Sequence, residues 1–461
     1  MMIKKSTVFI IVLLLSNLSG AAQNPANYRS EDIYSISRKL EKTARNRIWP
    51  GFELSRYTRL KTGDNGGYIH FSSDPDADPE RNFSWRLDDE YFQNHALEEN
   101  LLITFHEAFH AFERDQRRPG LAWGAENAML VFEYQESSAR NNALFRIEAM
   151  ILRRALEEKK EFDLKKLVQE FISVRRLRQS ELEPRFVEFE KGAELNEGLA
   201  EYAGTRAVVL GIETARQNKI GFADANETDF LRGKYARLDS ITDLGRNIRL
   251  KFYYTGSAQG FLLDRLMPTD WKTKVQMEGK SLQDLLLTTA EKAKIPSPLI
   301  KYGYAKILAE EEKAVAARKA ENQALLEKTL GAPGKKLTVD FSALNEGAGI
   351  RQFDPMNVTM ISPQLRVHTR SVAFAANDIF SAEFSQPVIE DLEKKRYVAI
   401  IPENEIRSIS ADGEELSRTG ATEKRFGRKL LIKTDNFTFE ADGGGIVKIS
   451  EKELIVLLGG G

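Results

Sequence analysis

The sequence predicts an α+β protein: a mostly helical domain with a small N-terminal β element, followed by a small all-β domain, a sandwich or a barrel. Three observations predict this. The chain has 461 residues, more than one typical domain needs, so two or three domains are expected. Residues from about 88 to 330 follow helical periodicity almost throughout. Residues 335–461 instead form short runs rich in β-branched and aromatic residues, separated by Gly, Asn and Asp turns.

The N-terminus has the three-part layout of a secretory signal peptide, which we expect to span residues 1–22. Two lysines precede the apolar run Ser6–Leu15, and small and polar residues follow at Ser19–Gln23. The apolar run is shorter than the roughly 20 residues that a membrane-spanning helix needs. We therefore expect cleavage near Ala22, a secreted or periplasmic protein, and no stable membrane anchor after cleavage. The alternative is an uncleaved anchor.

Composition excludes several kinds of partner and site. Lys and Arg total 67 against 68 Asp and Glu, a net charge of −1, so there is no electrostatic case for nucleic acid or an anionic membrane. The chain has no cysteine, which excludes disulfides, catalytic thiols, a lipid-modified cysteine and thiolate metal sites. A metal site in this chain would have to do without thiolate ligands.

The mostly helical domain, residues 23–330, is expected to begin with a helix and a hairpin. Ser30–Arg47 is predicted to be an amphipathic helix with Ser30 as its N-cap. Tyr57–Lys61 and Gly67–Ser72 flank a glycine-rich turn and predict a β-hairpin. The last helix of the domain is expected at Tyr302–Leu330, where a Gly-Ala-Pro-Gly segment ends it.

Glycine and proline residues divide the rest of the chain into segments. Breaks in the helical pattern fall at Arg118–Gly120, Gly192, Gly211, Met267–Pro268 and Pro296–Pro298. In the all-β domain, residues 335–461, the expected strands are Leu337–Phe341, Leu365–Phe374, Tyr397–Ile401, Lys429–Lys433, Phe437–Ala441 and Ile446–Ile449. The all-β domain carries no motif that indicates a particular chemistry.

One helical segment carries the residues of half a zinc site. Leu101–Glu113 reads LLITFHEAFHAFE, and His106 and His110 share one face of the helix because they lie four residues apart. Two imidazoles placed this way can both point a nitrogen at a metal ion about 2.0–2.1 Å away. Glu107 turns to the next face, where it can reach a metal-bound water without binding the metal. The alternative is a half-buried helix with two incidental histidines and a solvated glutamate.

A site with two histidines needs a third protein ligand, and here a carboxylate must supply it, because the next histidine is His368 in the β domain. The best segment is Ala193–Gly204, which reads AELNEGLAEYAG and is predicted to be helical. Three glutamates at spacings of three and four share one face of it: Glu194, Glu197 and Glu201. One can bind the metal while the glutamate four residues on accepts a hydrogen bond from a ligand histidine. Taken alone, three solvated glutamates would be the simpler interpretation.

HEAFH followed by LNEGLAEY resembles the gluzincin metallopeptidases, the thermolysin and aminopeptidase-N group, in which an N-E-x-x-x-[DE] helix supplies the third ligand. The resemblance implies a zincin-like fold for the helical domain, a bound Zn²⁺ and a peptide or protein substrate. The residues that match the family pattern are the zinc ligands His106, His110 and Glu197, the general base Glu107, the supporting acid Glu201 and, before the third ligand, Asn196.

The resemblance covers two helices and departs from the family in two ways. The stretch between His110 and Glu197 is much longer than in that group. Its helical pattern, Glu126–Glu158 and Asp163–Arg178, predicts an inserted helical pair within about 120–190 that covers the cleft. No G-x-M-E-N-like segment, with which aminopeptidases hold a free N-terminus, lies upstream, so exopeptidase action is not implied.

Two further sites follow from the resemblance. Arg249–Leu266 is similar to the segment of these peptidases where a tyrosine precedes a glycine-led helix. Tyr254 is therefore the candidate that stabilises the oxyanion, with Tyr253 as the alternative. The strand with His70 precedes the zinc helix, where thermolysin-like folds place an edge strand that pairs with substrate, so His70 could line the cleft. A purely structural role is the other interpretation of each of these residues.

The function implied is an exported zinc-dependent metallopeptidase in which Glu107 takes a proton from the attacking water. Two other interpretations remain open. One is a non-catalytic exported binding protein built on a peptidase-like scaffold. The other is a zinc amidase or deacylase that acts on a small molecule.

Overall fold

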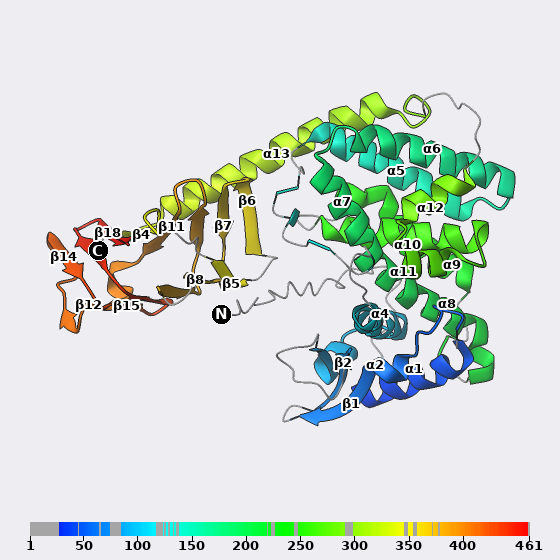
Figure 1. The fold of residues 1–461 in the computed structure, drawn as a ribbon, viewed down its shortest axis with the longest axis horizontal. Coiled ribbons are helices and arrows are strands. Elements are labelled where there is room, and N and C mark those ends of the chain that lie inside the picture. The colour runs from blue at the N-terminus through cyan, green and yellow to red at the C-terminus, as the bar shows by residue number, and fades with distance from the viewer. Residues whose placement is uncertain are drawn as a thin grey trace. The chain divides into compact units, whose positions relative to one another are not determined.

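The computed structural model describes residues 27–459 except 45, 64–65, 74–83, 117–122, 124–125, 128–129, 132, 135–137, 219, 223–225, 244–247, 291–297, 345–348, 354–356, 371 and 377–378. The predicted signal peptide, residues 1–22, lies outside the described part. The described residues form two compact units, a helical unit up to Glu312 and a β unit from Lys313 (Figure 1). The predicted α+β class is confirmed. No helix in the described ranges is both long and apolar enough to cross a membrane.

The helical unit surrounds one hydrophobic core. Its helices are α1 (Ser30–Ala44), α2 (Leu54–Tyr57), α3 (Asp89–Gln93), α4 (Leu97–Asp115), α5 (Ala139–Glu157), α6 (Glu161–Gln179), α7 (Pro184–Ala193), the π-helical turn η2 (Glu194–Gly198), α8 (Leu199–Asn218), α9 (Glu227–Tyr235), the 3₁₀ segment η3 (Ala236–Asp243), α10 (Arg249–Leu266), α11 (Trp271–Glu278), α12 (Leu282–Thr289) and the first part of α13 (Tyr304–Leu330). Helix α4 packs against α1, α2 and α8 (Figure 1).

A small antiparallel sheet precedes α4, with the strands β1 (Thr58–Gly63), β2 (Gly66–Ser72) and β3 (Ser84–Asp88) in that order. The predicted hairpin is confirmed as β1 and β2. The sequence pattern does not predict β3, and β3 overturns the expectation that the strand with His70 is an edge strand. Because β3 pairs with β2, His70 lies on the middle strand, whose backbone is already paired on both sides and cannot pair with an extended substrate.

Helix α1 begins at Ser30 as predicted but ends at Ala44 rather than Arg47, and its predicted cap is wrong. The backbone N–H and the hydroxyl of Ser30 both donate to Asp89 Oδ1, at 2.7 and 2.6 Å. The other oxygen of Asp89 accepts from the backbone N–H of Gly67 at 3.1 Å. The Ser30 side chain therefore ties α1 to α3 and β2 through one carboxylate. Ser30 is already the first helical residue, and the first intrahelical hydrogen bond runs from the Ile33 N–H to the carbonyl of Arg29.

The predicted helical pair is present as α5 and α6, which pack side by side (Figure 1). Helix α5 begins at Ala139 rather than near Glu126, because Ser138 caps it by accepting from the backbone N–H of Asn141. Apolar side chains of both helices, such as Leu144 and Phe171, are buried in the same core as α4 and α8. The pair is therefore part of the body of the helical unit.

The β unit consists of two sheets, together with the end of α13 and the short 3₁₀ turn η5 (Glu403–Glu405). Its strands are β4 (Lys335–Asp340), β5 (Gly349–Phe353), β6 (Val358–Ser362), β7 (Leu365–His368), β8 (Val372–Ala376), β9 (Phe380–Phe384), β10 (Val388–Asp391), β11 (Arg396–Ile401), β12 (Ile406–Ala411), β13 (Glu414–Glu415), β14 (Thr422–Phe426), β15 (Lys429–Thr434), β16 (Phe437–Asp442), β17 (Gly445–Ile449) and β18 (Glu453–Leu458). One sheet has the order β14-β17-β18-β4-β11-β10-β7-β6 and the other β13-β12-β15-β16-β9-β8-β5.

The two sheets share one hydrophobic core, which is the arrangement of a sandwich. The described strand pairs are antiparallel except β18 with β4, which are parallel. The predicted strand Leu365–Phe374 is in fact two strands, β7 and β8, which belong to different sheets. The chain leaves one sheet after His368 and enters the other at Val372, a change of sheet that no Gly, Pro, Asn or Asp marks in this segment.

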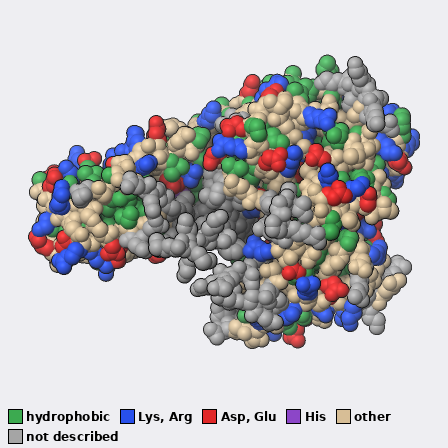
Figure 2. Space-filling model, viewed as in Figure 1, with side chains coloured by type: hydrophobic (Ala, Val, Ile, Leu, Met, Phe, Trp, Pro, Cys, Tyr) green, Lys and Arg blue, Asp and Glu red, His purple; other side chains and the backbone are tan. Residues whose placement is uncertain are grey.

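Charged side chains of both signs are interspersed on the face drawn in Figure 2, among the residues that the structure describes. A second set of charges is buried in the helical unit, including Glu148, Arg175, Arg178 and Glu194. Buried charges are costly unless they are paired. Several of these charges are paired at the turn η2, where Arg175 binds Glu194.

Candidate metal centre

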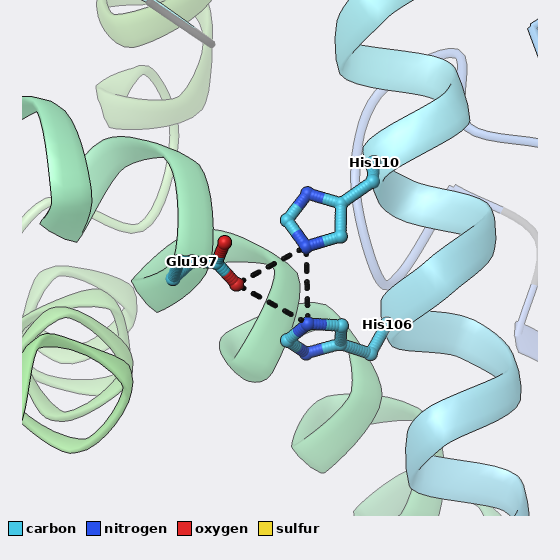
Figure 3. A group of neighbouring side chains, drawn as sticks. All are labelled: His106, His110 and Glu197. Atoms are coloured by element: carbon cyan, nitrogen blue, oxygen red, sulfur yellow. Dashed lines mark hydrogen bonds and ion pairs between the residues drawn. The ribbon is translucent and has the colours of Figure 1, made fainter. Parts of the chain in front are cut away.

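Helix α4 is held so that its two histidines face η2. The adjoining face of α4 carries Phe105 and Phe109, which are buried in the core. Trp49 packs edge-on against Phe109 with ring centroids 5.3 Å apart. Because these rings fix the rotation of α4 about its axis, His106 and His110 both point at the neighbouring helix (Figure 3).

Three ligand atoms meet in a small triangle. His106 Nε2 and His110 Nε2 lie 3.1 Å apart, and Glu197 Oε2 lies 3.6 and 3.3 Å from them (Figure 3). His106 is 3% exposed and Glu197 5%, and this Glu197 oxygen makes no well-formed hydrogen bond within the described part of the chain. Ligand atoms about 2.0–2.1 Å from a tetrahedral zinc are about 3.3 Å apart, so the triangle has the dimensions of one face of such a site. The buried group His106, His110 and Glu197 could therefore hold a metal ion.

The π-helical turn η2 carries Glu197, and glycines set its distance from the neighbouring helices. A Cβ atom on Gly198 would lie 2.6 Å from Gly256 Cα of α10, a separation that real side chains do not reach. A Cβ atom on Gly204 of α8 would overlap the carbonyl oxygen of Leu102 on α4. These two close crossings place Glu197 opposite the histidines. Turns of π-helix are rare and are frequently found at functional sites.

Replacing Gly198 with Ala is expected to destabilise the protein by about 1–3 kcal/mol, because the added methyl group must push η2 away from α10. Chemical denaturation of the metal-free protein measures this change. Gly233→Ala is the matched control: Gly233 lies inside α9, and its added methyl group would meet no atom within 4 Å. That control is expected to be neutral or to stabilise the protein by up to about 1 kcal/mol. Equal stability of the two variants would contradict the prediction.

A carboxylate lies beside the far nitrogen of each histidine ring. Glu201 Oε2 lies 3.2 Å from His106 Nδ1, as the family pattern implies for this residue. Glu113 Oε2 lies 3.5 Å from His110 Nδ1, and sequence reasoning missed it although it is only three residues from that histidine. Such partners fix the orientation of the ring and leave Nε2 free for a metal.

Lys234 on α9 is buried at 2% exposed and donates a hydrogen bond to Glu201 Oε1. Burial alone would raise the pKa of Glu201, but Lys234 and His106 outweigh it and lower this pKa to about 2. Burial would lower the pKa of Lys234, and Glu201 raises it instead. Lys234, Glu201 and His106 thus form a chain that ends at the metal group. No local pattern marks Lys234, so sequence reasoning missed it.

Lys234→Met is expected to destabilise the metal-free protein by about 3–5 kcal/mol, because it leaves the Glu201 carboxylate buried without its cation. The double variant Lys234→Met/Glu201→Gln should recover part of that loss, because neither buried charge then remains. Denaturant unfolding of the wild type, both single variants and the double variant gives the coupling energy between the two residues. Strictly additive losses would show that the pair is not coupled.

Arg249 binds the other oxygen of the carboxylate ligand. It donates to Glu197 Oε1 and also makes two 2.8 Å hydrogen bonds to Glu126. Asn196 Nδ2 donates to the same Glu126 carboxylate at 2.8 Å, so Asn196 supports the ligand indirectly. Burial would raise the pKa of Glu197, but Arg249 and His110 outweigh it and hold this pKa well below its ordinary value. Glu197 is therefore ionised and suited to bind a cation.

Glu107 follows His106 and is only partly buried. Burial raises the pKa of Glu107, and the nearby His106 and His110 partly offset this effect. Sequence reasoning missed Tyr91 of α3: burial raises the pKa of Tyr91, and the charges of Glu99 and Glu107 raise it further. The Tyr91 hydroxyl is buried and has no hydrogen-bond partner among the described residues.

The two candidate tyrosines of α10 have different surroundings. The ring of Tyr253 stacks on His106, with centroids 5.4 Å apart and an angle of 16° between the planes. Burial raises the pKa of Tyr253, and the adjacent Glu197 raises it further. Tyr254, the residue preferred from the sequence, instead lies under the Lys234 ammonium group, 5.3 Å from its ring centroid. These contacts favour Tyr253 as the hydroxyl at the metal group.

Comparison with known proteins identified no relative of this chain. The chain matches no protein-family model, no curated protein and no solved structure. Among the residues that the structure describes, His106, His110 and Glu197 are the only group of histidine and carboxylate side chains placed to hold a metal ion.

Proposed function

We propose that this protein is an exported zinc-dependent metallopeptidase that hydrolyses peptide bonds. The triangle of His106, His110 and Glu197 carries the proposal. Two imidazole nitrogens and one carboxylate oxygen are a donor set that suits catalytic zinc, which keeps one position open. The zincin-like identity of the helical unit is part of the same proposal, and the motifs HEAFH on α4 and LNEGLAEY on η2 and α8 support it.

The residues of the site have distinct roles in this proposal. His106, His110 and Glu197 would hold the ion, which when bound would supply a Lewis acid that polarises a carbonyl group. Glu107 accepts a proton from the attacking water and passes it to the leaving nitrogen. Tyr253 donates a hydrogen bond to the carbonyl oxygen as negative charge develops on it. Tyr253 takes this role in place of Tyr254 because its ring lies on His106.

Metal analysis and a peptide-library digest test the proposal together. We expect one zinc per chain and cleavage of library peptides by the wild type. A zinc-free wild-type protein would rule out the metal centre. A zinc protein that cleaves small amides but no peptide would support the amidase or deacylase interpretation instead, and one that cleaves neither would support a binding protein.

A further inference from the structure

We infer that Arg175, on α6, is a positioning residue of the metal centre that acts on the ligand Glu197 through Glu194. The inference rests on the proposed function and goes beyond it, because α6 lies outside both metal-binding motifs. It assigns a role to the helical pair that separates those motifs in the sequence: α6 holds the turn that carries the third ligand.

Arg175 binds the first residue of η2 with a two-pronged contact. Its Nη1 donates to Glu194 Oε2 at 2.8 Å and its Nη2 donates to Glu194 Oε1 at 2.9 Å. Its Nε donates to Glu148 Oε2 of α5 at 2.9 Å. All three side chains are buried. A bidentate arginine–carboxylate pair fixes orientation as well as distance, so Glu194 is held firmly against α5 and α6.

Glu194 is also held from the other side. Thr255 Oγ1 of α10 donates to Glu194 Oε1 at 2.7 Å, next to the close crossing of Gly256 and Gly198. Glu194 and Gly198 are the first and last residues of η2, so both ends of the π-helical turn are fixed, and Glu197 lies between them.

Loss of the Arg175 contact would leave the Glu194 side chain, at the first end of the turn, with the single hydrogen bond from Thr255. One residue corresponds to about 100° of rotation around a helix, so a turn that relaxes from π toward α geometry would swing Glu197 away from the histidines. We therefore expect weaker metal binding and a changed arrangement of the ligands, and not only a less stable protein.

Arg178 provides a matched control on the same helix. It lies one turn after Arg175, is 1% exposed against 2% for Arg175, and belongs to the same buried network. Its guanidinium binds Glu148 and Glu190 rather than the first residue of η2. Replacing either arginine with methionine removes one buried positive charge, and the two arginines have similar surroundings. Only Arg175→Met breaks the contact with Glu194.

The experiment measures zinc affinity, by competition with a chelator, and the visible absorption spectrum of the cobalt(II)-substituted protein in the full chain. Arg175→Met is expected to weaken zinc binding about 10–100-fold, as changes behind metal ligands typically do, and to alter the cobalt spectrum. Arg178→Met is expected to bind zinc within a few-fold of the wild type and to keep the wild-type cobalt spectrum.

Wild-type affinity and spectrum in Arg175→Met would overturn the inference, and so would equal losses in both arginine variants, which indicate a general structural role. If Arg175→Met does not fold, Arg175→Lys replaces it, because lysine keeps the buried positive charge but cannot make the two-pronged contact with Glu194. Weaker zinc binding in Arg175→Lys supports the inference, and wild-type binding overturns it. A wild-type protein that binds neither zinc nor cobalt would overturn the proposed function itself and this inference with it.

Discussion

Glu107→Gln is expected to lower kcat for peptide hydrolysis by about 10²–10⁴-fold while zinc still binds. Glutamine keeps the shape of the side chain but cannot take a proton from water. Its position beside His106, outside the three-atom ligand group, predicts that zinc content stays at the wild-type level. Two measurements on the same preparations test these expectations: the rate of peptide-library cleavage and the zinc content per chain.

Glu98→Gln is the matched control for this variant, because Glu98 lies in the first turn of the same helix, away from the histidines. We expect wild-type cleavage and zinc content from it. If Glu107→Gln keeps both its zinc and full activity, Glu107 is not the general base. If Glu107→Gln loses its zinc, Glu107 belongs to the ligand group and the assignment of Glu197 must be revised.

His106→Ala is expected to remove zinc binding. Two of the three ligand atoms would remain, and Glu201 would lose the ring nitrogen that it holds. Zinc at about 100 times its dissociation constant should stabilise the wild type by about 2.7 kcal/mol, because only the folded state binds it. The measurement is denaturant unfolding with and without zinc, and His106→Ala should show no zinc-dependent difference.

Because each variant is compared with itself, with and without zinc, any general destabilisation from the missing ring cancels. His70→Ala is the control: His70 lies on β2, where its Nε2 is 2.6 Å from Ser84 Oγ, and it is not part of the metal group. It should keep the full zinc-dependent stabilisation. A zinc-dependent gain in His106→Ala equal to that of the wild type would show that the metal binds elsewhere.

Local geometry made part of this protein predictable. The spacing of His106 and His110 is enough to place them on one face of a helix, because helical geometry depends only on neighbouring residues. The same reasoning correctly pairs β1 with β2 across their glycine turn, because a short turn brings adjacent strands together. Glu113 was within reach of this argument, since it lies one helical turn after His110.

Pairings between distant segments could not be predicted in this way. Lys234 and Arg249 bind carboxylates on η2 and α8 that lie far from them in the sequence, and no spacing rule connects them. Tyr253 and Tyr254 are adjacent on α10, so their side chains point about 100° apart. Only the packing of α10 against η2 decides which of the two rings reaches His106.

The sequence by itself determined which side chains share a helix face and which chemical groups a metal site could use, since both depend on residue type and short-range geometry. The tertiary structure decided that a carboxylate from a remote turn meets the two histidines at 3.3 and 3.6 Å. It also decided that His70 lies on a middle strand and that α6 braces the turn with the third ligand. Those outcomes depend on how helices and strands pack, which is set by close glycine crossings and buried ion pairs between residues far apart in the chain.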